Sequence, residues 1–504
     1  MRLRLFVGAL AFLIAGCDDA TGPNVSGLDP MAIARIEIVP QLDTLVVQDT
    51  LSPGDTLRLR AAVVLRSGGV LTDVQLAWQS SDPAVAVVGP TGLVLATGYG
   101  TATITASAGK TATAQVVVIP AFPADTVANR VAVDMDGTIA VGGETTCVRT
   151  DRLRIFCSGE NFDRELGSAA RDTVCSDAYG QANERDEMIP CSLVPLRIDS
   201  PLRLASVVLG EDHGCALDLA GTAICWGRSD SGQVGNGRAA TQVPPTIVSG
   251  VHQFRALTAG YAHTCGIATD GGAWCWGLDA DGQLGGERLV AWSTTPIPVD
   301  GGRTDWAQLS AGDRHTCGVT TGGQAFCWGD GAAGQLGNGT AARSLTPVAV
   351  LGGLNFTAVA AGGDVSCGIV QNGAVYCWGS DSLGQLGRDA LNSASAVPVL
   401  VDGGGGYTAI AAGGQLVCGL RNGAAVCWGS YDLNNQGTQS AGTRPTPVSG
   451  APPFARIEVG RRHACGVTEA GEVHCWGSNV FGPFGDGLQA LWRPTPQRFL
   501  LPSH

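Results

Sequence analysis

The chain has 504 residues, and its 44 Asp and Glu against 31 Lys and Arg give a formal net charge of −13. Its one lysine is Lys110, and no run of Lys or Arg occurs after the first few residues. A protein that binds nucleic acid needs a basic surface, so the composition excludes that class and predicts no nucleic-acid partner.

The first residues have the pattern of a secretory signal peptide, which we predict over residues 1–16. Arg2 and Arg4 precede an apolar run, Leu5–Leu13, and small residues precede Cys17. The run is too short to span a bilayer comfortably. Its end resembles the lipobox of bacterial lipoproteins, which implies that Cys17 is lipidated. We therefore expect an exported protein, anchored by this lipid alone to the bacterial cell envelope, on its periplasmic side or at the cell surface.

Residues 17–32 are polar and contain Gly and Pro, as is typical of a tether. Residues 33–119 hold no cysteine and alternate strand signals with turns, which predicts a β-sandwich. Trp78–Pro83 and Gly100–Ala106 resemble motifs of the bacterial immunoglobulin-like domain of group 2. The resemblance implies a spacer domain whose tryptophan lies in the core. Residues 120–130 are the predicted linker to the next domain.

A cysteine frame of about ten residues recurs seven times within residues 131–500. In one copy Cys265 is followed by the turn Asp270-Gly271, and Cys275-Trp276-Gly277 ends the frame. Each frame lies in a unit of about 50 residues with four strand signals. This periodicity predicts an all-β fold in which the sandwich is followed by a seven-bladed β-propeller, with an open solenoid as the alternative.

The phase of the repeat predicts how the ring closes. The last unit ends in a Pro-flanked strand at Thr495–Phe499, and the first unit opens at Ile139–Cys147 without such a strand before it. We expect these two segments to pair and complete the last blade, because pairing would remove both free sheet edges.

The repeated segments also carry linked motifs. HTCGIATDGGAWCWG is followed by GQLG, HTCGVTTGGQAFCWG by GQLGNG, and Ala-Gly-x-x-His elements recur at the start of the frames. These motifs resemble the regulator of chromosome condensation repeat over roughly Arg130 to Phe499. The resemblance implies a seven-bladed β-propeller. The paired cysteines depart from the general pattern of that family and suit an oxidising compartment.

Seventeen cysteines, less the lipidated Cys17, leave an even number. Cross-strand neighbours in a hairpin bring their Cβ atoms within reach of a disulfide, whereas zinc sites prefer Cys-x2-Cys pairs with further ligands nearby. We therefore predict eight disulfides and no metal site. The predicted pairs are Cys147 with Cys157, Cys175 with Cys191, Cys215 with Cys225, Cys265 with Cys275, Cys317 with Cys327, Cys367 with Cys377, Cys418 with Cys427, and Cys465 with Cys475.

Four histidines, His213, His263, His315 and His463, hold the same place, two residues before the first frame cysteine. They could ring a channel as metal ligands or bases, but we expect each to hydrogen-bond a loop of its own blade. The frame tryptophans could form a stacking platform, but we expect them to fill the cores between blades. No nucleophile elbow, zinc-protease motif or phosphate loop occurs in a suitable context, so we predict no catalytic residue, cofactor or enzyme activity.

The first unit departs most from the others, because it carries a long insertion after Gly167. Long insertions on a rigid scaffold are often functional, so we predict that this one binds a partner; the alternative is a solvated surface loop. Loops with Asp230, Asp281 and Asp381 are the next places to consider. The predicted contact residues of the insertion are Arg171, Asp177, Tyr179, Glu184, Arg185 and Glu187.

These features together predict a monomeric, non-catalytic binding module, a disulfide-stiffened propeller that presents its loops to a protein or glycan at the cell envelope. An inhibitor of a secreted enzyme is the alternative, since a secreted bacterial propeller that inhibits β-lactamases shares the expected fold. A propeller enzyme, or the guanine-nucleotide exchange that fold analogy alone would suggest, is the remaining possibility.

Overall fold

The structure is a computed structural model in which the chain divides into two compact units, residues 1–126 and 127–504. Among the described residues the secondary structure consists of strands, without a helix. The described residues are 33–39, 45–46, 56–65, 70–71, 76–84, 86–96, 100–108 and 110–118 in the first unit. In the second unit they are 138–501 except 169–172, 177–187, 201, 251, 288–289, 300–301, 390–393 and 432–439.

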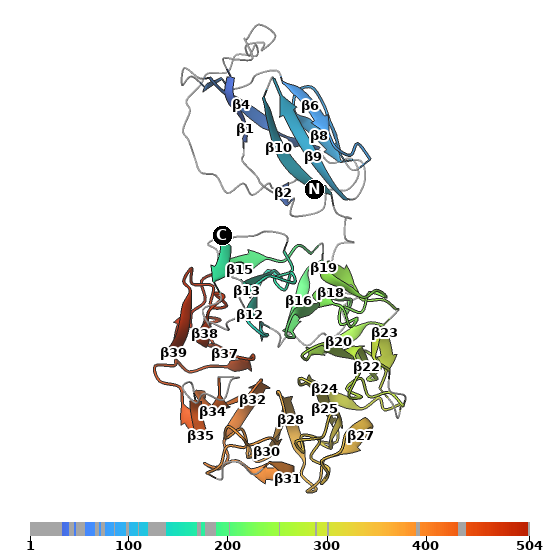
Figure 1. Ribbon diagram of the computed structural model, residues 1–504, viewed down its shortest axis with the longest axis vertical. Coiled ribbons are helices and arrows are strands. Elements are labelled where there is room, and N and C mark those ends of the chain that lie inside the picture. The colour runs from blue at the N-terminus through green and yellow to red at the C-terminus, as the bar shows by residue number, and fades with distance from the viewer. Residues whose placement is uncertain are drawn as a thin grey trace. The chain divides into compact units, whose positions relative to one another are not determined.

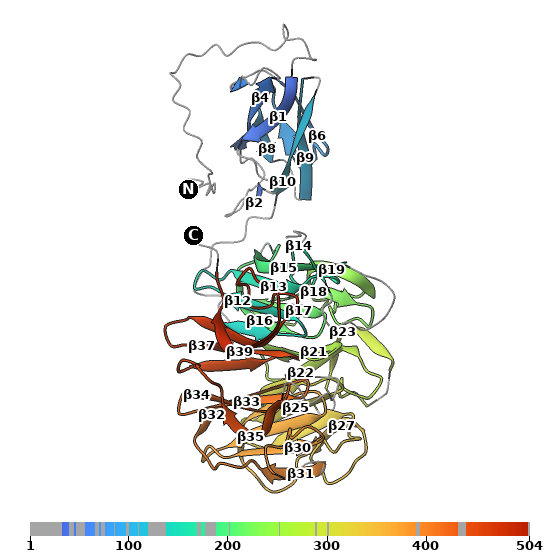
Figure 2. The same ribbon diagram turned by 60° about the vertical axis from the view of Figure 1, so that its left-hand side comes forward.

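The first unit is a small β-sandwich. In β9 (Gly100–Ser107) the buried residues Ala102, Ile104 and Ala106 alternate with less buried neighbours, as one face of the strand meets the core. Trp78 is half-buried, with its ring against Gly92. β1 (Ile33–Val39) packs on β9 and β10 (Thr111–Val118) (Figure 2). The sheet orders are β1-β4-β5, β2-β10-β9-β6 and β3-β8-β7, with β2 (Leu45–Val46), β3 (Thr56–Arg58), β4 (Arg60–Leu65), β5 (Val70–Leu71), β6 (Ala77–Ser80), β7 (Ala86–Val88) and β8 (Leu93–Ala96).

The second unit is a ring of seven antiparallel sheets, named blades 1 to 7 in chain order (Figure 1). Blade 3 shows the pattern with β20 (Phe254–Ala259) innermost, then β21 (His263–Ala268), β22 (Ala273–Leu278) and β23 (Trp292–Pro298) outermost. The seven-bladed propeller predicted from the repeat is therefore confirmed.

The remaining blades repeat this order, and blade 1 adds one strand. Blade 1 holds β11 (Ile139–Val141), β12 (Thr145–Arg149), β13 (Ile155–Glu160), β15 (Met188–Arg197) and the added β14 (Thr173–Ser176). Blade 2 holds β16 (Leu204–Leu209), β17 (His213–Asp218), β18 (Ala223–Ser229) and β19 (Ala240–Ile247). Blade 4 holds β24 (Trp306–Ala311), β25 (His315–Thr320), β26 (Ala325–Gly329) and β27 (Ser344–Ala349). Blade 5 holds β28 (Phe356–Ala361), β29 (Val365–Val370), β30 (Val375–Gly379) and β31 (Ser395–Leu400). Blade 6 holds β32 (Tyr407–Gly413), β33 (Leu416–Arg421), β34 (Ala424–Ser430) and β35 (Ser440–Pro447). Blade 7 holds β36 (Arg456–Val459), β37 (His463–Val467), β38 (Val473–Asn479) and β39 (Ala490–Arg498).

A disulfide joins the two middle strands of every blade. Cys265 and Cys275 lie directly opposite each other on β21 and β22, with 4.1 Å between their Cα atoms. An eighth disulfide links Cys175 to Cys191 in the insertion of blade 1. The structure thus contains all eight predicted pairs, each bridging neighbouring strands and buried. The other six frame disulfides join Cys147 to Cys157, Cys215 to Cys225, Cys317 to Cys327, Cys367 to Cys377, Cys418 to Cys427, and Cys465 to Cys475.

The frame tryptophans fill the cores between blades, as predicted. Trp276 is fully buried and packs among residues of blades 2 and 3 such as Val234 and Phe254. Its indole Nε1–H donates to the Gln233 carbonyl in the preceding blade (2.9 Å). Blade 1 has Ser158 instead of tryptophan, and its hydroxyl makes the corresponding bond back to Pro483 O (3.1 Å). Each blade is thereby tied to the one before it.

The predicted strand exchange at ring closure is wrong. β39 pairs with β38, and β11 pairs with β12, so each blade is one continuous stretch of chain. The first unit of the repeat is complete because its own Pro-flanked strand, β15, pairs with β13. Blades 7 and 1 instead pack against each other as complete sheets, with Phe499 of blade 7 and Ile139 of blade 1 buried in one cluster.

Candidate functional site

Two sets of loops emerge at the same end of every blade. Because neighbouring strands run antiparallel, the loop from the first strand to the second leaves the sheet at the end where the loop from the third strand to the fourth also leaves it. We call this side of the ring the loop face. Its short loops are 142–144, 210–212, 260–262, 312–314, 362–364, 414–415 and 460–462, and its long loops begin after residues 160, 229, 278, 329, 379, 430 and 479.

The short loops touch one another around the axis of the ring. A Cβ atom at Gly260 would lie 2.2 Å from the Gly312 carbonyl oxygen and 2.6 Å from Cε1 of His263, so only glycine fits there. The backbone N–H of Tyr261 donates to the same Gly312 carbonyl (3.2 Å). Equivalent bonds recur between other neighbouring blades, for example from Arg461 N to Gly142 O (3.2 Å). The centre of the loop face is therefore a platform of interlocked backbone.

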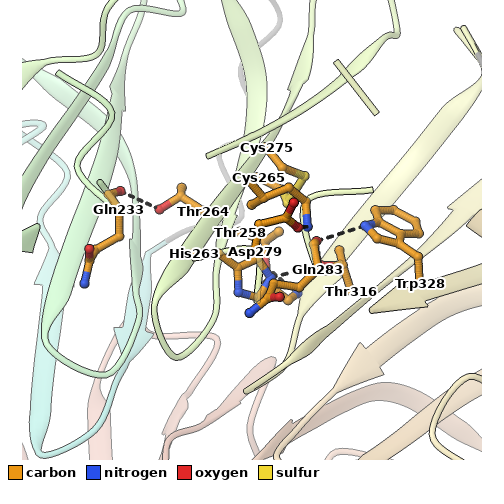
Figure 3. The surroundings of a disulfide bond; sticks show 12 residues. Gln233, Thr258, His263, Thr264, Cys265, Cys275, Asp279, Gln283, Thr316 and Trp328 are labelled. Atoms are coloured by element: carbon orange, nitrogen blue, oxygen red, sulfur yellow. Dashed lines mark hydrogen bonds between the residues drawn. A yellow bond between two sulfur atoms is a disulfide. The ribbon is translucent and has the colours of Figure 1, made fainter. Parts of the chain in front are cut away.

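The four frame histidines lie beneath this platform and bind the next blade, which corrects the expectation that each bonds a loop of its own blade. Nε2 of His263 lies 2.9 Å from the hydroxyl of Thr316 in blade 4. That hydroxyl donates onward to the Gln283 carbonyl (2.9 Å), so it accepts from the imidazole. Figure 3 shows Gln283 bonded also to Trp328, and the matching Gln233–Thr264 bond one blade earlier.

Burial keeps these histidines neutral. Desolvation lowers the pKa of His213 and His315 to about 4, and that of His263 and His463 to about 3. Each ring is almost completely buried and committed to a hydroxyl group. They act as ties between blades rather than as bases. Among the described residues no group of three His, Cys, Asp or Glu is placed to hold a metal ion.

Carboxyl groups gather on the loop face of blades 1 and 2. Burial raises the pKa of Glu144 to about 8, partly offset by Arg462, and Glu160 and Glu211 raise it further. Burial likewise raises the pKa of Glu160 to about 7, with Asp212 and Glu211 adding to the shift. Asp212 has its pKa raised to about 6, again chiefly by burial. The negative charge of this region therefore grows as the pH rises through the neutral range.

Two arginines of blade 7 reach across to these carboxylates. Arg461 Nη1 lies 2.5 Å from Glu211 Oε1, and Arg462 Nε lies 3.5 Å from Glu144 Oε1. Glu165 takes the place that glutamine holds in several other loops, and it is buried, with Oε2 accepting the backbone N–H of Asp163 (3.0 Å). Sequence reasoning missed these groups, although they stand at positions where the repeats differ.

The exposed aromatic rings of the described residues also lie on the loop face. Phe162 in the long loop of blade 1 is 53% exposed, and Trp292, opposite Leu278 at the start of β23, is 51% exposed. Tyr261 in the short loop of blade 3 is 40% exposed, and the guanidinium of Arg461 lies 5.3 Å from its ring centroid. An aromatic residue at a variable position of the repeat is the sequence signal that could have singled these out.

The residues predicted to bind a partner fall mostly outside the described part of the chain. This holds for Arg171, Asp177, Tyr179, Glu184, Arg185 and Glu187, and also for Cys17. The flanks of the insertion are described: β14 pairs with β15, and Cys175 and Cys191 are buried against Val480 and Phe481 of blade 7. The base of the insertion therefore covers the seam between the last and first blades.

The three aspartates considered next differ in their roles. Asp230 is exposed on the loop face and pairs with Arg228 (2.6 Å). Asp281 is half-buried and lies 3.7 Å from Arg314. Asp381 is buried, and its Oδ1 accepts the backbone N–H of Leu386 (3.0 Å), so it shapes its loop and does not face a partner.

Comparison with known proteins agrees with this architecture. Two family models described as regulator of chromosome condensation (RCC1) repeat match, one at residues 205–233, 254–283, 306–335, 356–385 and 454–482 and the other at 270–319, 322–369 and 372–420. A model described as intimin, immunoglobulin-like domain matches residues 64–110, so the first unit is similar to such domains; its assignment to group 2 stays a prediction. No helix in the described part of the chain has the length and apolar character needed to cross a membrane.

Solved structures share the fold. Human WBSCR16 is 23% identical, covers 69% of this chain and 95% of its own, and has a TM-score of 0.60. Prp20p from Saccharomyces cerevisiae is 18% identical, covers 73% and 88%, and has a TM-score of 0.56. The ultraviolet-B receptor UVR8 of Arabidopsis thaliana is 29% identical over 153 residues, which are 29% of this chain and 34% of UVR8, so the match spans about a third of that relative. With its repeats matched and its blades in this arrangement, the chain belongs to the RCC1 repeat family.

Proposed function

We propose that this protein is a non-catalytic binding module whose loop face holds a protein partner. The observation that carries the proposal is the location of Phe162, Tyr261 and Trp292, whose exposed rings lie on one face of the ring. Exposed aromatic side chains on a rigid support are typical anchors of protein interfaces. The disulfides and the interlocked short loops hold this support in one shape, which lowers the entropy lost on binding.

The chemistry of the ring favours binding over catalysis. Its histidines are neutral and occupied by hydroxyl groups, so they are poor candidates for general bases. Among proteins of similar structure, Prp20p has binding properties to Gsp1p and histones. Binding of a protein by this chain is in line with that relative, whereas the identity of its partner is a matter for experiment.

We further propose that the protein is exported and held at the cell envelope by a lipid on Cys17, with the immunoglobulin-like unit as a spacer. Eight disulfides suit an oxidising compartment, where they form and persist. The signal-like residues 1–16 would direct the chain there.

The test is a comparison of two matched variants in a pull-down from envelope extract. Phe162→Ser with Trp292→Ser removes two loop-face anchors, exposed by 53% and 51%. Ile247→Ser with Leu400→Ser removes side chains exposed by 58% and 51% on the outermost strands β19 and β31. They pair with Ile224 and Tyr376, the second residues of the third strands, at the end away from the loop face.

A partner retained by the wild type and by the second variant but lost from the first would support the proposal. Equal retention by both variants would place binding elsewhere. If the partner is an enzyme whose turnover falls on binding, the module is an inhibitor; a partner found only among glycans would reject the proposed protein ligand.

A further inference from the structure

We propose that the loop face of blades 1 to 3 binds a cationic protein segment in which Arg or Lys side chains alternate with apolar ones. This inference rests on the proposed function and names the chemistry of its partner. The surface, called the aromatic–acidic surface below, consists of Phe162, Glu160, Asp212, Asp230, Tyr261 and Trp292.

These residues sit on adjoining blades that are bonded to one another. The Phe162 carbonyl accepts a hydrogen bond from Gln242 Nε2 of blade 2 (2.7 Å), so the long loop of blade 1 reaches the outer strand of blade 2. Asp212 and Asp230 of blade 2 share the guanidinium of Arg228, at 3.3 and 2.6 Å. Blade 2 therefore lies between the aromatic rings of blades 1 and 3. On its loop face, two carboxylates share one arginine.

Phe162 and Trp292 are more than half exposed among the described residues, whereas the ring of Tyr261 is contacted by Arg461. Large aromatic side chains are normally buried, and exposed ones mark binding surfaces. In other blades the place of Tyr261 is taken by residues such as Gly143, Glu211 and Asp313. The fold does not need an aromatic ring there, so its presence is a property of blade 3 and not of the repeat.

The electrostatic environment selects a cationic partner. Besides its burial, the carboxyl group of Glu160 is influenced by Asp212, Glu211 and Asp163, which raise its pKa, and by Arg462, which lowers it. The described loop residues 160–168 contain three Asp and Glu and one Arg. A positive group approaching this region is attracted both by the carboxylates and by the faces of the aromatic rings.

The molecule already contains one example of the proposed contact. The guanidinium of Arg461 lies 5.3 Å from the centroid of Tyr261 while its Nη1 contacts Glu211 at 2.5 Å. A ligand arginine placed over Phe162 or Trp292 and next to Asp230 would make the same combination of ring and carboxylate. A second copy of this chain is a poor occupant, because two molecules with a net charge of −13 repel each other.

The test uses two fluorescein-labelled peptides as probes, one of four Arg-Gly-Leu repeats and one of four Glu-Gly-Leu repeats, with the full protein and anisotropy as the readout. We expect the arginine peptide to bind and the glutamate peptide not to bind. Phe162→Ser with Trp292→Ser should weaken binding at least about tenfold, the range of a lost aromatic anchor. Ile247→Ser with Leu400→Ser should leave it within about twofold, because those side chains lie outside the surface.

Charge is tested by a second matched pair. Asp230→Asn should weaken the arginine peptide about threefold at about 0.1 M salt and less at about 1 M, where the Debye length falls from about 10 Å to about 3 Å. Asp270→Asn is the control, since Asp270 is exposed in the frame turn at the other end of blade 3 and its Oδ1 contact to Gly272 N can be kept by asparagine. Thermal unfolding of each variant verifies that the ring is intact.

Three outcomes would overturn the inference: no binding of the arginine peptide, equal weakening by the control variants, or tighter binding of the glutamate peptide. Equal weakening by Asp230→Asn and Asp270→Asn would mean that the peptide responds to the net charge of the protein alone. If a captured partner depends on Phe162 and Trp292 while the arginine peptide does not bind, the proposed function stands and only the cationic chemistry fails.

Discussion

Nε2 of His463 lies 2.7 Å from the hydroxyl of Thr146, so the last blade is joined to the first by an imidazole–hydroxyl bond between residues 317 positions apart. The same bond occurs between other neighbouring blades. In two contacts that lack the histidine, apolar side chains fill both places, as with Val365 and Val417 in one buried cluster. Where one blade has the histidine, the next blade therefore has a Thr or Ser hydroxyl that bonds to it. The other pairs are His213–Thr264, His263–Thr316 and His315–Ser366.

The closure bond should show strong coupling between its two residues. Thr146→Val leaves the buried Nε2 of His463 without its hydrogen-bond partner and should lower the free energy of unfolding by about 1–3 kcal/mol. The double variant Thr146→Val with His463→Val copies the apolar pair of Val365 and Val417 and should lose less than the sum of the single variants. Chemical denaturation of the four proteins measures the difference; simple additivity would mean that the bond contributes nothing in solution.

The frame disulfides should be complete and local in their effect. In the folded, unreduced protein all sixteen paired cysteines should resist alkylation, as read by mass spectrometry. Replacing Cys265 and Cys275 together with Ala should lower the free energy of unfolding by at most about 2.5–3 kcal/mol, the loop-entropy value for an 11-residue loop. Several alkylated cysteines per native molecule would contradict the disulfide framework.

The sequence predicts what lies within one unit better than what joins two units. Cys265 and Cys275 lie ten positions apart in one hairpin, and the short turn between its strands places them opposite each other. This pairing can be predicted without knowing how the blades are arranged. The partner of His263 is Thr316, 53 positions away, and only the placement of whole blades brings them together. The prediction of ring closure was wrong for the same reason. Blade 1 already contains its own outer strand, β15, which pairs with β13, so it needs no strand from the last unit.

The candidate site was predictable only in part. Blade 1 departs most from the repeat, and the acidic loops do lie on blade 1 and its neighbour blade 2, so this departure correctly indicated the region of the candidate site. The exposure of Trp292 could not be predicted, because tryptophans elsewhere in the repeat, such as Trp276, are buried. The burial of Asp381 depends on its bond to Leu386, a local loop geometry that a single aspartate in sequence does not reveal.

The free energy of unfolding of the Glu144→Gln variant should increase relative to that of the wild type as the pH rises. Glu144 has a folded-state pKa of about 8 against a usual value of 4.5, through burial, with Arg462, Glu160, Glu211 and Ser478 around it. A raised pKa of this kind stabilises the fold below pH 4.5, and the stabilisation is lost as the pH rises through 8. The wild type should therefore lose up to about 1.4 kcal/mol per pH unit relative to the variant across this window.

Thermal and chemical unfolding of the wild type and Glu144→Gln at several pH values between these limits measures the effect. The difference should level off above the folded-state pKa, because the carboxyl group is then ionised in both states. Asp270→Asn serves as a control for the loss of a carboxyl group, since this aspartate is exposed in a turn. A constant difference for Glu144→Gln would show that its carboxyl group titrates normally.

Cys17→Ser should abolish attachment of the lipid and release the protein from membranes, or leave an uncleaved precursor. The reason is chemical, since serine cannot form the thioether that carries the proposed acyl anchor. Labelling with a fatty-acid probe and fractionation of the membranes read the result. Label that persists on the variant would exclude Cys17 as the site of attachment.

Removing the insertion should weaken the seam of the ring as well as any binding by the loop. Cys175 and Cys191 bury Val480 and Phe481 of blade 7, so a variant that lacks 173–187 and carries Cys191→Ser exposes these two side chains. Full exposure of an apolar side chain of this size costs about 1.5–3 kcal/mol. We expect a lower midpoint of thermal unfolding with the seven frame disulfides still formed.

The matched control keeps both cysteines and replaces only Tyr179 and Glu184 with Ser, which should leave the midpoint unchanged. An unchanged midpoint in the deletion variant would mean that the hairpin is a surface loop without a role in closing the ring.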